Sequence, residues 1–345
     1  MKKIIFTFLV LLSTVNFYSC ETYNFTNFEE AIFNTPQKVN KIKEPIRENV
    51  RLSVLWAGHS TVLLQIYDKV ILTDPLLTDM AGGIMKRKKE SGLDLDGVTK
   101  LDAVLISHAH MDHLSFGSLE LLENKFPQAN LVFPDGVQYF IPDMNFNMKK
   151  IDNNNGFKNC NIGETIEING IKITSVFALH SGGRYGLDSY VWGMNGYTGY
   201  IISYKDVCIF FSGDTGYNKK SFKEIGSRFK IDLALIQLGP CEDCKEEGCD
   251  EHVSSAGALD IYNDLNAEYF IPVHFGALKY NNDPDYPAAV LKELIYEFAG
   301  GKNNELVPVS NFSAGIKDNE KINSLHEKYK NKILILKEGE QVILK

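Results

Sequence analysis

The 345-residue sequence lacks the features that mark several large classes of protein. It has no excess of positive charge, because 44 Asp and Glu against 36 Lys and Arg give a net charge of −8, and this argues against a general nucleic-acid binder. No Gly-rich phosphate loop stands between a strand and a helix, so no nucleotide site is expected. No repeat with a period of about 20–50 residues stands out. The remaining composition, 44% hydrophobic and 23% charged, indicates a folded protein.

Long apolar runs are also scarce, and the one at the N-terminus is too short to span a bilayer, which takes about 20 residues. Two lysines precede this run, Ile4–Leu12, and the small residue Ser19 stands before Cys20. The pattern is typical of an export signal and resembles a bacterial lipoprotein signal. We therefore expect residues 1–20 to be a signal peptide. The mature protein would be exported and anchored to the membrane through lipidated Cys20, facing the periplasm or cell surface; a helical anchor is the alternative.

The cysteines are few, and three of the six, Cys241, Cys244 and Cys249, stand close together before His252. In an exported protein this cluster favours a loop that carries a disulfide. Three sulfurs and one histidine also have the ligand count of a zinc site. Both interpretations stay open from the sequence.

Residues 21–50 are polar and are expected to form a tether, whereas short apolar runs separated by turn residues begin at residue 51. The runs predict strands at Leu52–Trp56, Val62–Ile66, Val70–Leu72, Ala103–Ile106, Asn130–Phe133, Ile171–Phe177, Tyr200–Ser203, Val207–Phe211, Leu233–Ile236 and Tyr269–Val273. Helices are expected at Phe116–Glu123, Ser221–Ile225, Ser254–Leu265 and Pro287–Phe298. Strands that pair early and later alternate with helices predict an α/β fold with a layered sheet core, in one domain over residues 51–345.

The segment Leu105–Leu114 carries the strongest chemical signal. A short apolar strand runs directly into His108, His110, Asp112 and His113. Imidazole and carboxylate are the side chains that bind zinc-class metals. In an extended chain alternate residues point to the same side, so His108 and His110 can reach one ion, and Asp112 and His113 can reach a second.

Three more apolar strands each end on a potential metal ligand. These ligands are His180 after the strand at 171–177, Asp214 after the strand at 207–211, and His274 after the strand at 269–273. One such residue alone is weak evidence, because a buried histidine usually finds a backbone hydrogen bond. Together with the histidine-rich segment they make seven ligands, enough for two ions that share one carboxylate. All seven positions are filled, which favours an enzyme over a degenerate metal-binding scaffold.

The order His-x-His-x-Asp-His, then His, then Gly-Asp-Thr, then His resembles the metallo-β-lactamase superfamily of dinuclear metallohydrolases. Further motifs resemble its branch of N-acylphosphatidylethanolamine-hydrolysing phospholipases D. These motifs are Gly58-His59-Ser60-Thr61, Leu72-Thr73-Asp74-Pro75, Ser181-Gly182-Gly183-Arg184 with Trp192, Gly213-Asp214-Thr215-Gly216-Tyr217, Asp232–Ile236, His252-Val253, Val273-His274-Phe275-Gly276 and Leu336–Glu340. The resemblance covers about residues 51–345.

The resemblance implies a metallo-β-lactamase fold, an αββα sandwich of two mixed sheets flanked by helices. It implies two Zn²⁺ per chain, although iron or manganese suits the same ligands. The first metal would be held by His108, His110 and His180. The second metal would be held by Asp112, His113 and His274, with Asp214 bridging the two. Asp74 would orient a ligating imidazole, or would simply form an Asp-Pro turn; His59 is expected to have a structural or supporting role.

For the reaction, the resemblance implies a hydroxide held between two ions about 3.5–4 Å apart, which attacks phosphorus and expels an alkoxide. The expected function is a dinuclear zinc phosphodiesterase of the N-acylphosphatidylethanolamine phospholipase D type, and a lactonase or β-lactamase of the same fold is the alternative. Asp112 and Asp214 would act in catalysis as ligands. His252 would protonate the leaving oxygen or bind phosphate, unless it merely begins a helix. Arg184 would pair with phosphate, unless it is an exposed loop residue.

The run Lys86-Arg87-Lys88-Lys89 is a basic patch within a glycine-bounded insertion. Such a run is usually a solvated face of a loop. In a lipid hydrolase it would also hold the protein against anionic head groups. The expected substrate partner is a small molecule or a lipid.

Overall fold

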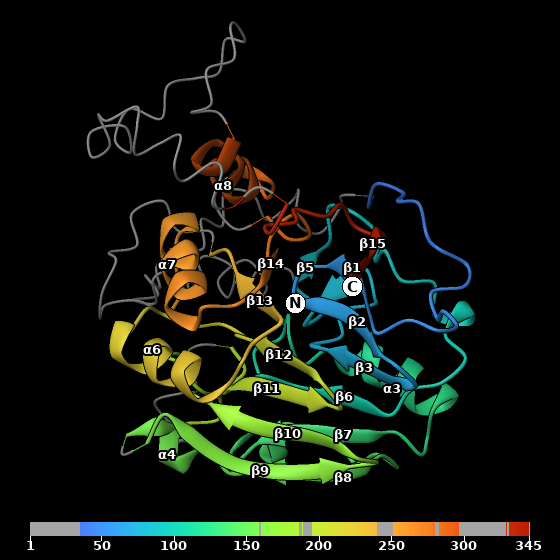
Figure 1. The fold of residues 1–345 in the computed structure, drawn as a ribbon. Coiled ribbons are helices and arrows are strands. Elements are labelled where there is room, and N and C mark those ends of the chain that lie inside the picture. Colours follow the sequence, from blue (N-terminus) through green and yellow to red (C-terminus); the bar gives the residue numbers. More distant parts are fainter. Residues whose placement is uncertain are drawn as a thin grey trace, which may run out of the picture.

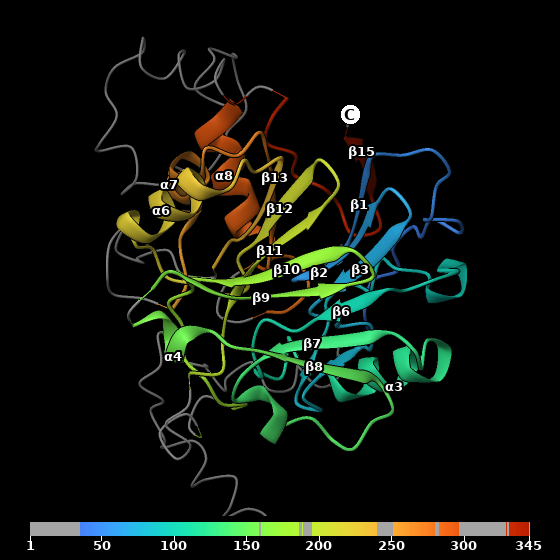
Figure 2. The same cartoon turned by 60° about the horizontal axis from the view of Figure 1, so that its bottom comes forward.

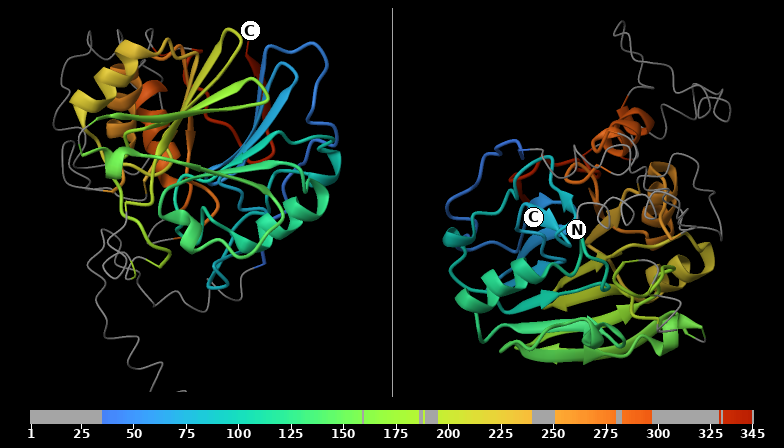
Figure 3. Two further views of the ribbon diagram at one scale, coloured as in Figure 1. Left: turned by 90° about the horizontal axis from the view of Figure 1, so that it is seen from below. Right: turned by 180° about the vertical axis from the view of Figure 1, so that it is seen from behind.

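Two β-sheets lie face to face, and helices cover the outer side of each (Figures 1, 2 and 3). This computed structural model describes residues 35–158, 160–185, 188, 195–239, 251–279, 283–296, 329 and 331–344. The arrangement is the αββα sandwich predicted from the sequence. The signal peptide, Cys20 and the cluster of Cys241, Cys244 and Cys249 lie outside the described residues, so the interpretations of those segments stay predictions.

The first sheet has seven strands in the order β15-β1-β2-β3-β6-β7-β8. Their bounds are β1 Leu52–Gly58, β2 Thr61–Ile66, β3 Lys69–Thr73, β6 Ala103–Leu105, β7 Asn130–Pro134, β8 Asn147–Ile151 and β15 Gln341–Leu344. The pairs formed by β15, β1, β2 and β3 are antiparallel, and β3, β6, β7 and β8 run parallel. The two-stranded hairpin β4 (Met80–Ala81) and β5 (Met85–Lys86) follows β3.

The second sheet has six strands in the order β14-β13-β12-β11-β10-β9. Their bounds are β9 Ile162–Ile168, β10 Ile171–Val176, β11 Gly199–Tyr204, β12 Val207–Phe211, β13 Leu233–Gln237 and β14 Tyr269–Val273. Strands β9 to β12 form antiparallel pairs, whereas β12, β13 and β14 run parallel. Because β10 and β12 are both antiparallel to β11, strands β10, β12 and β14 all run in one direction and end at the same edge.

Helix α3 (Phe116–Lys125) covers the first sheet, and α6 (Lys219–Arg228), α7 (Ser255–Leu265) and α8 (Tyr286–Tyr296) cover the second (Figure 1). Shorter turns of helix are η2 (Leu95–Gly97), η3 (Val137–Tyr139) and α4 (Asn154–Phe157). The caps explain where the helices start: Ser115, Asn218 and Ser254 each accept a hydrogen bond from the backbone N–H three residues on. None of the helices in the described part of the chain is long and apolar enough to cross a membrane.

Strand β1 shows how the layers are held together. Its side chains alternate, so that Leu52, Val54 and Trp56 enter the core between the sheets, while Leu55 and Ala57 pack toward α3. All five are fully buried. Each large side chain of this kind contributes about 1.5–3 kcal/mol through burial, so both faces of the strand anchor the sandwich.

The ten predicted strands and four predicted helices are confirmed to within a few residues at their ends. The sequence prediction missed β8, β9, β15 and the β4–β5 hairpin. Strands β8, β9 and β15 lie at sheet edges, and β8 exposes four of its five residues while β9 fully buries only Ile168. Strands β8 and β9 face water and lack the apolar run that identified the others, whereas β15 was missed although it holds the short run Val342–Leu344.

Residues 35–50, the second half of the expected tether, lie against the domain. Gln37 exchanges backbone hydrogen bonds with Lys88 and Glu90. The side chains of Ile42 and Ile46 pack against the apolar layer under α3. This part of the chain is therefore attached to the fold by both hydrogen bonds and apolar contact.

Candidate metal centre

Four strand ends bring the predicted ligands to one edge of the sandwich. His108 follows β6 in the first sheet, while His180, Asp214 and His274 follow the co-directional strands β10, β12 and β14 of the second. Each of these four side chains is at most 6% exposed. The convergence predicted from the apolar runs is therefore present in the fold.

Three histidines form the first group. His180 Nε2 lies 3.2 Å from His108 Nε2 and 3.2 Å from His110 Nδ1. Zinc–nitrogen bonds of about 2.0–2.1 Å in a tetrahedron place two nitrogens about 3.3 Å apart. The three nitrogens therefore have the spacing of ligands around one ion.

The protonation state of these rings suits metal binding. Burial, together with the neighbouring histidines, holds the pKa of His108 and His180 well below the ordinary value. Burial lowers the pKa of His110 to about 4. The imidazoles are therefore neutral near pH 7, and neutral imidazole is the form that donates a lone pair to a metal.

The second group surrounds Asp214. Its Oδ2 lies 3.1 Å from His113 Nε2 and 3.0 Å from His274 Nε2. Asp112 Oδ2 lies 3.6 Å and 3.9 Å from the same two nitrogens. Because Asp214 Oδ2 is also 3.9 Å from His108 Nε2, this carboxylate stands between the two groups.

The electrostatics of the second group fit a bound cation. His113 lies among Asp214, Asp112 and Asp74, and these carboxylates raise its pKa well above the ordinary value against the effect of burial. Asp214 Oδ1 is buried and has no hydrogen-bond partner among the described residues. Burying several carboxylates together raises the free energy of the folded state unless positive charge neutralises them. A divalent cation would supply that neutralisation in place of the proton that the raised pKa puts on His113, which would leave this imidazole neutral and able to ligate, so the donor set fits a second ion.

The ligands are oriented by partners around them. Asp74 Oδ2 lies 2.7 Å from His113 Nδ1, and both oxygens of Asp74 accept hydrogen bonds from Ser107, one from its backbone N–H and one from its hydroxyl. His180 Nδ1 lies 3.0 Å from the carbonyl oxygen of Glu251. Such outer contacts select the tautomer and the direction of a ligating imidazole. The structure thus places Asp74 in the orienting role.

His252 lies at the rim of this cluster, just before α7. Its Nε2 is 3.2 Å from Asp214 Oδ2, and its ring centroid is 5.2 Å from that of His180. The side chain is 12% exposed, about as much as that of Asp112 at 13%. The structure therefore brings His252 to the predicted ligands, beside Asp214 and His180.

Arg184 is turned toward the protein rather than toward the ligands. Its Nη1 donates hydrogen bonds to the carbonyl oxygens of Ala109 at 3.2 Å and Leu114 at 2.7 Å. The guanidinium also lies 3.8 Å from the ring centroid of Phe116. These contacts hold both ends of the histidine-rich segment, so the position differs from the expected phosphate contact. The guanidinium is buried and Nη1 is taken up by the two carbonyl oxygens, while Nε has no hydrogen-bond partner among the described residues.

The basic run at 86–89 does not form an exposed patch. Arg87 is fully buried and donates from Nη1 to the carbonyl oxygen of Leu76 at 2.7 Å and from Nη2 to that of Ala57 at 3.2 Å. Lys89 forms ion pairs with Asp285 and Glu338. Arg87 is thus engaged inside the fold and Lys89 is paired with carboxylates, which leaves little of the membrane-facing charge expected from the sequence.

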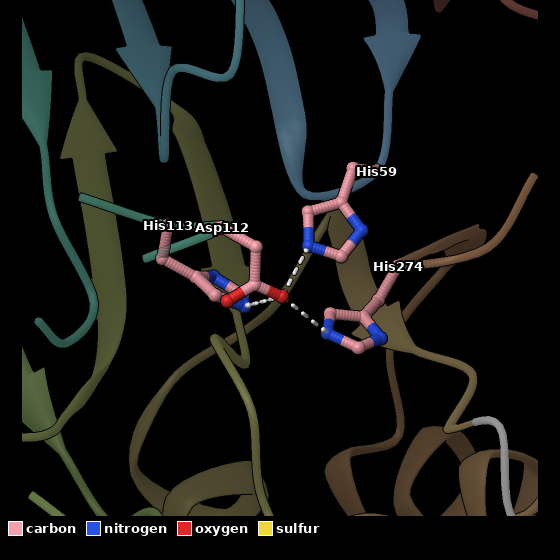
Figure 4. Close-up of side chains that lie close together, drawn as sticks. All are labelled: His59, Asp112, His113 and His274. Carbon is pink, nitrogen blue, oxygen red and sulfur yellow. Dashed lines mark hydrogen bonds and ion pairs between the residues drawn. The ribbon is translucent and has the colours of Figure 1, made fainter. Parts of the chain in front are cut away.

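His59 is a residue whose contacts were not anticipated. It is 1% exposed, and its Nε2 lies 3.0 Å from Asp112 Oδ2 (Figure 4). Figure 4 shows the rings of His59, His113 and His274 arranged around the Asp112 carboxylate. The Gly58-His59 pair at the end of a predicted strand was the available signal, but the sequence does not say which way the ring turns.

Comparison with known proteins agrees with this geometry. A model of the beta-lactamase superfamily domain matches residues 69–275. N-acyl-phosphatidylethanolamine-hydrolyzing phospholipase D 1 of Caenorhabditis elegans is 29% identical over 258 residues, which cover 71% of this chain and 70% of that protein. A metal-dependent hydrolase of Sulfolobus acidocaldarius is 29% identical over 232 residues, 66% of this chain and 87% of its own length.

Among solved structures, the metallo hydrolase Igni18 of Ignicoccus hospitalis superposes with a TM-score of 0.52 at 19% identity, covering 85% of this chain and 98% of that one. This likeness supports the fold. The domain model spans more than half of the chain and includes all seven predicted ligands. The chain therefore belongs to the beta-lactamase superfamily, and it is a metal-dependent hydrolase of the metallo-β-lactamase fold.

Proposed function

We propose that the protein is a dinuclear zinc phosphodiesterase that hydrolyses N-acylated phosphatidylethanolamine at the head-group alcohol. The observation that carries the proposal is the division of seven ligands, five buried and two partly buried, into two groups with the Asp214 carboxylate between them. Two divalent ions in such a site would supply Lewis acidity and an activated water. Iron or manganese would suit the same donors, and the metal available to the protein would decide between them.

Each of the two ions would be held by its own set of ligands, with one ligand shared. His108, His110 and His180 would hold the first, and Asp112, His113 and His274 would hold the second. Asp214 would serve both, since its Oδ2 is within 4 Å of nitrogens from each group. The nitrogen and oxygen donors and the spacing within the first group are those of zinc sites.

The choice of substrate is supported by the relative from Caenorhabditis elegans, whose name specifies N-acylphosphatidylethanolamine hydrolysis of the phospholipase D type. In that reaction the oxygen of water forms a bond to phosphorus and the bond from phosphorus to the head-group oxygen breaks. The departing oxygen must gain a proton. We assign this proton to His252, and the assignment is supported by its Nε2 lying 3.2 Å from Asp214 Oδ2, next to the proposed ions.

The proposal includes export and attachment to the membrane through a lipid on Cys20. It is supported by the charged, apolar and small-residue pattern of residues 1–20. A lipid anchor would hold the enzyme at the surface where a phospholipid substrate resides. Radiolabelled palmitate in a bacterial host would label the full chain and not a Cys20→Ala variant; absence of label in both would refute lipidation.

The experiment that tests the proposed reaction is a substrate panel with zinc-loaded protein. N-acylphosphatidylethanolamine in detergent micelles, a lactone and a β-lactam are assayed side by side, with Asp214→Ala as the blank. We expect release of phosphatidic acid and N-acylethanolamine by the wild type alone. Turnover restricted to the lactone or to the β-lactam would reject the phosphodiesterase in favour of that activity.

A further inference from the structure

His59 occupies a backbone conformation that is unfavourable for a histidine. It is the first residue of the two-residue turn between β1 and β2, and its φ is +52°. Glycine adopts left-handed backbone readily, whereas another residue that is held in this conformation usually has a structural or functional reason to be there. Lys205 opens the turn between β11 and β12 with a similar φ of +54°, but its side chain is exposed, whereas that of His59 is buried.

Contacts of the His59 carbonyl oxygen and of its ring fix the direction in which the ring points. The carbonyl oxygen of His59 accepts a hydrogen bond from Trp56 Nε1 at 2.8 Å and another from the backbone N–H of His274 at 3.0 Å. Its ring packs on the ring of His274 with centroids 4.3 Å apart. A ring fixed from the backbone and from one face has little freedom to turn away from the site.

The edge of that ring meets Asp112. An ionised carboxylate only accepts hydrogen bonds, so the His59 nitrogen 3.0 Å from Asp112 Oδ2 is the donor. The nitrogens of His113 and His274 lie farther from the same oxygen, at 3.6 Å and 3.9 Å. Figure 4 shows that the three rings enclose this oxygen, with His59 reaching it from the β1–β2 turn.

Asp112 lies in a turn after β6 and not in a helix or strand, so a contact of its side chain is required to fix the direction of the carboxylate. A carboxylate on a short turn can rotate between several directions, and only some of them face His113 and His274. We propose that His59 is a positioning residue for Asp112, which holds this carboxylate in the direction required to bind the second ion. The inference rests on the dinuclear centre proposed above.

The test compares two variants that keep the bulk of the side chain. His59→Leu removes the donor, whereas the amide nitrogen of His59→Gln can still donate to Asp112 but is a poor zinc ligand. Lys205→Leu is the matched control, since it changes the first residue of an equivalent turn far along the chain. Zinc content after dialysis, second-site affinity by chelator competition, and the visible spectrum of the cobalt-substituted protein are measured for all four proteins.

We expect the wild type, Lys205→Leu and His59→Gln to retain two ions per chain. In His59→Leu the affinity of the second site should fall by about 10- to 100-fold, as for other partners of metal ligands, while the first site is unchanged. The cobalt spectrum of His59→Leu should lose the second-site component alone.

Each other outcome is decisive. Two tightly held ions in His59→Leu would overturn the inference, and equal loss in His59→Gln would show that the imidazole itself is needed as a ligand and would also overturn it. A wild type that binds fewer than two ions would reject the proposed dinuclear centre together with this inference. Failure of the wild type to hydrolyse phosphodiesters while it binds two ions would reject only the proposed substrate.

Discussion

The backbone N–H of His274 donates a hydrogen bond to the carbonyl oxygen of His59 at 3.0 Å, and both residues have left-handed backbone, with φ of +69° and +52°. The bond joins the end of β14 in the second sheet to the β1–β2 turn of the first. The metal centre is therefore built across the two sheets and depends on their relative position. Contacts that fix the sheets should consequently affect metal binding as well as stability.

The orienting role of Asp74 leads to a first prediction. Asp74→Asn replaces the carboxylate oxygen that lies 2.7 Å from His113 Nδ1, so this nitrogen of His113 loses its charged partner. We expect zinc affinity of the second site to fall by about 10- to 100-fold. Competition with a chromogenic chelator measures this affinity. As a control, Asp79→Asn changes an exposed aspartate nearby in the sequence, and this variant should bind zinc like the wild type. A second-site zinc affinity of Asp74→Asn equal to that of the wild type would contradict the role assigned to Asp74.

The buried guanidinium of Arg87 leads to a second prediction. Arg87→Met leaves the carbonyl oxygens of Leu76 and Ala57 without their donor and removes the cation that acts on buried Glu338. We expect the free energy of unfolding to fall by about 3 kcal/mol or more. Urea unfolding followed by circular dichroism gives the value, with Lys86→Met as the control. A loss below about 0.5 kcal/mol would be typical of a surface site and would show that the guanidinium is not buried as described.

Arg184 provides a third prediction, which separates its observed position from the role expected from the sequence. A lysine cannot reach both Ala109 and Leu114 while packing on Phe116, because it lacks the planar fork of guanidinium. Arg184→Lys should therefore lose about 1–2 kcal/mol of stability, with no specific rise in KM. Unfolding and steady-state kinetics are measured on the same preparation. A large increase in KM at unchanged stability would restore the phosphate-binding interpretation.

The candidate ligands could be predicted from the sequence because metal-binding side chains stand directly after short apolar runs. His108, His180, Asp214 and His274 each stand at the end of an apolar run, and parallel or co-directional strands end at a common edge. The layered fold followed from the same runs. Family resemblance then predicted how these ligands would be divided between two ions, and that division stays a prediction.

Other features depend on contacts between distant segments, and no local pattern reports them. Arg87 sits in a run of four cations that looks solvated, yet backbone carbonyl oxygens from β1 and from the segment after β3 surround it. Arg184 follows a metal ligand in a glycine-rich segment, but its donors turn inward to Ala109 and Leu114. The direction of His59 likewise depends on His274, a residue far along the chain.

A zinc titration of metal-free protein, with release of phosphatidic acid from N-acylphosphatidylethanolamine followed throughout, tests the dinuclear phosphodiesterase as a whole. We expect activity to rise with added zinc and to reach its plateau at two ions per chain, with no release by Asp214→Ala at any zinc concentration. A plateau at one ion would contradict the dinuclear centre. No release at saturating zinc would contradict the phosphodiesterase.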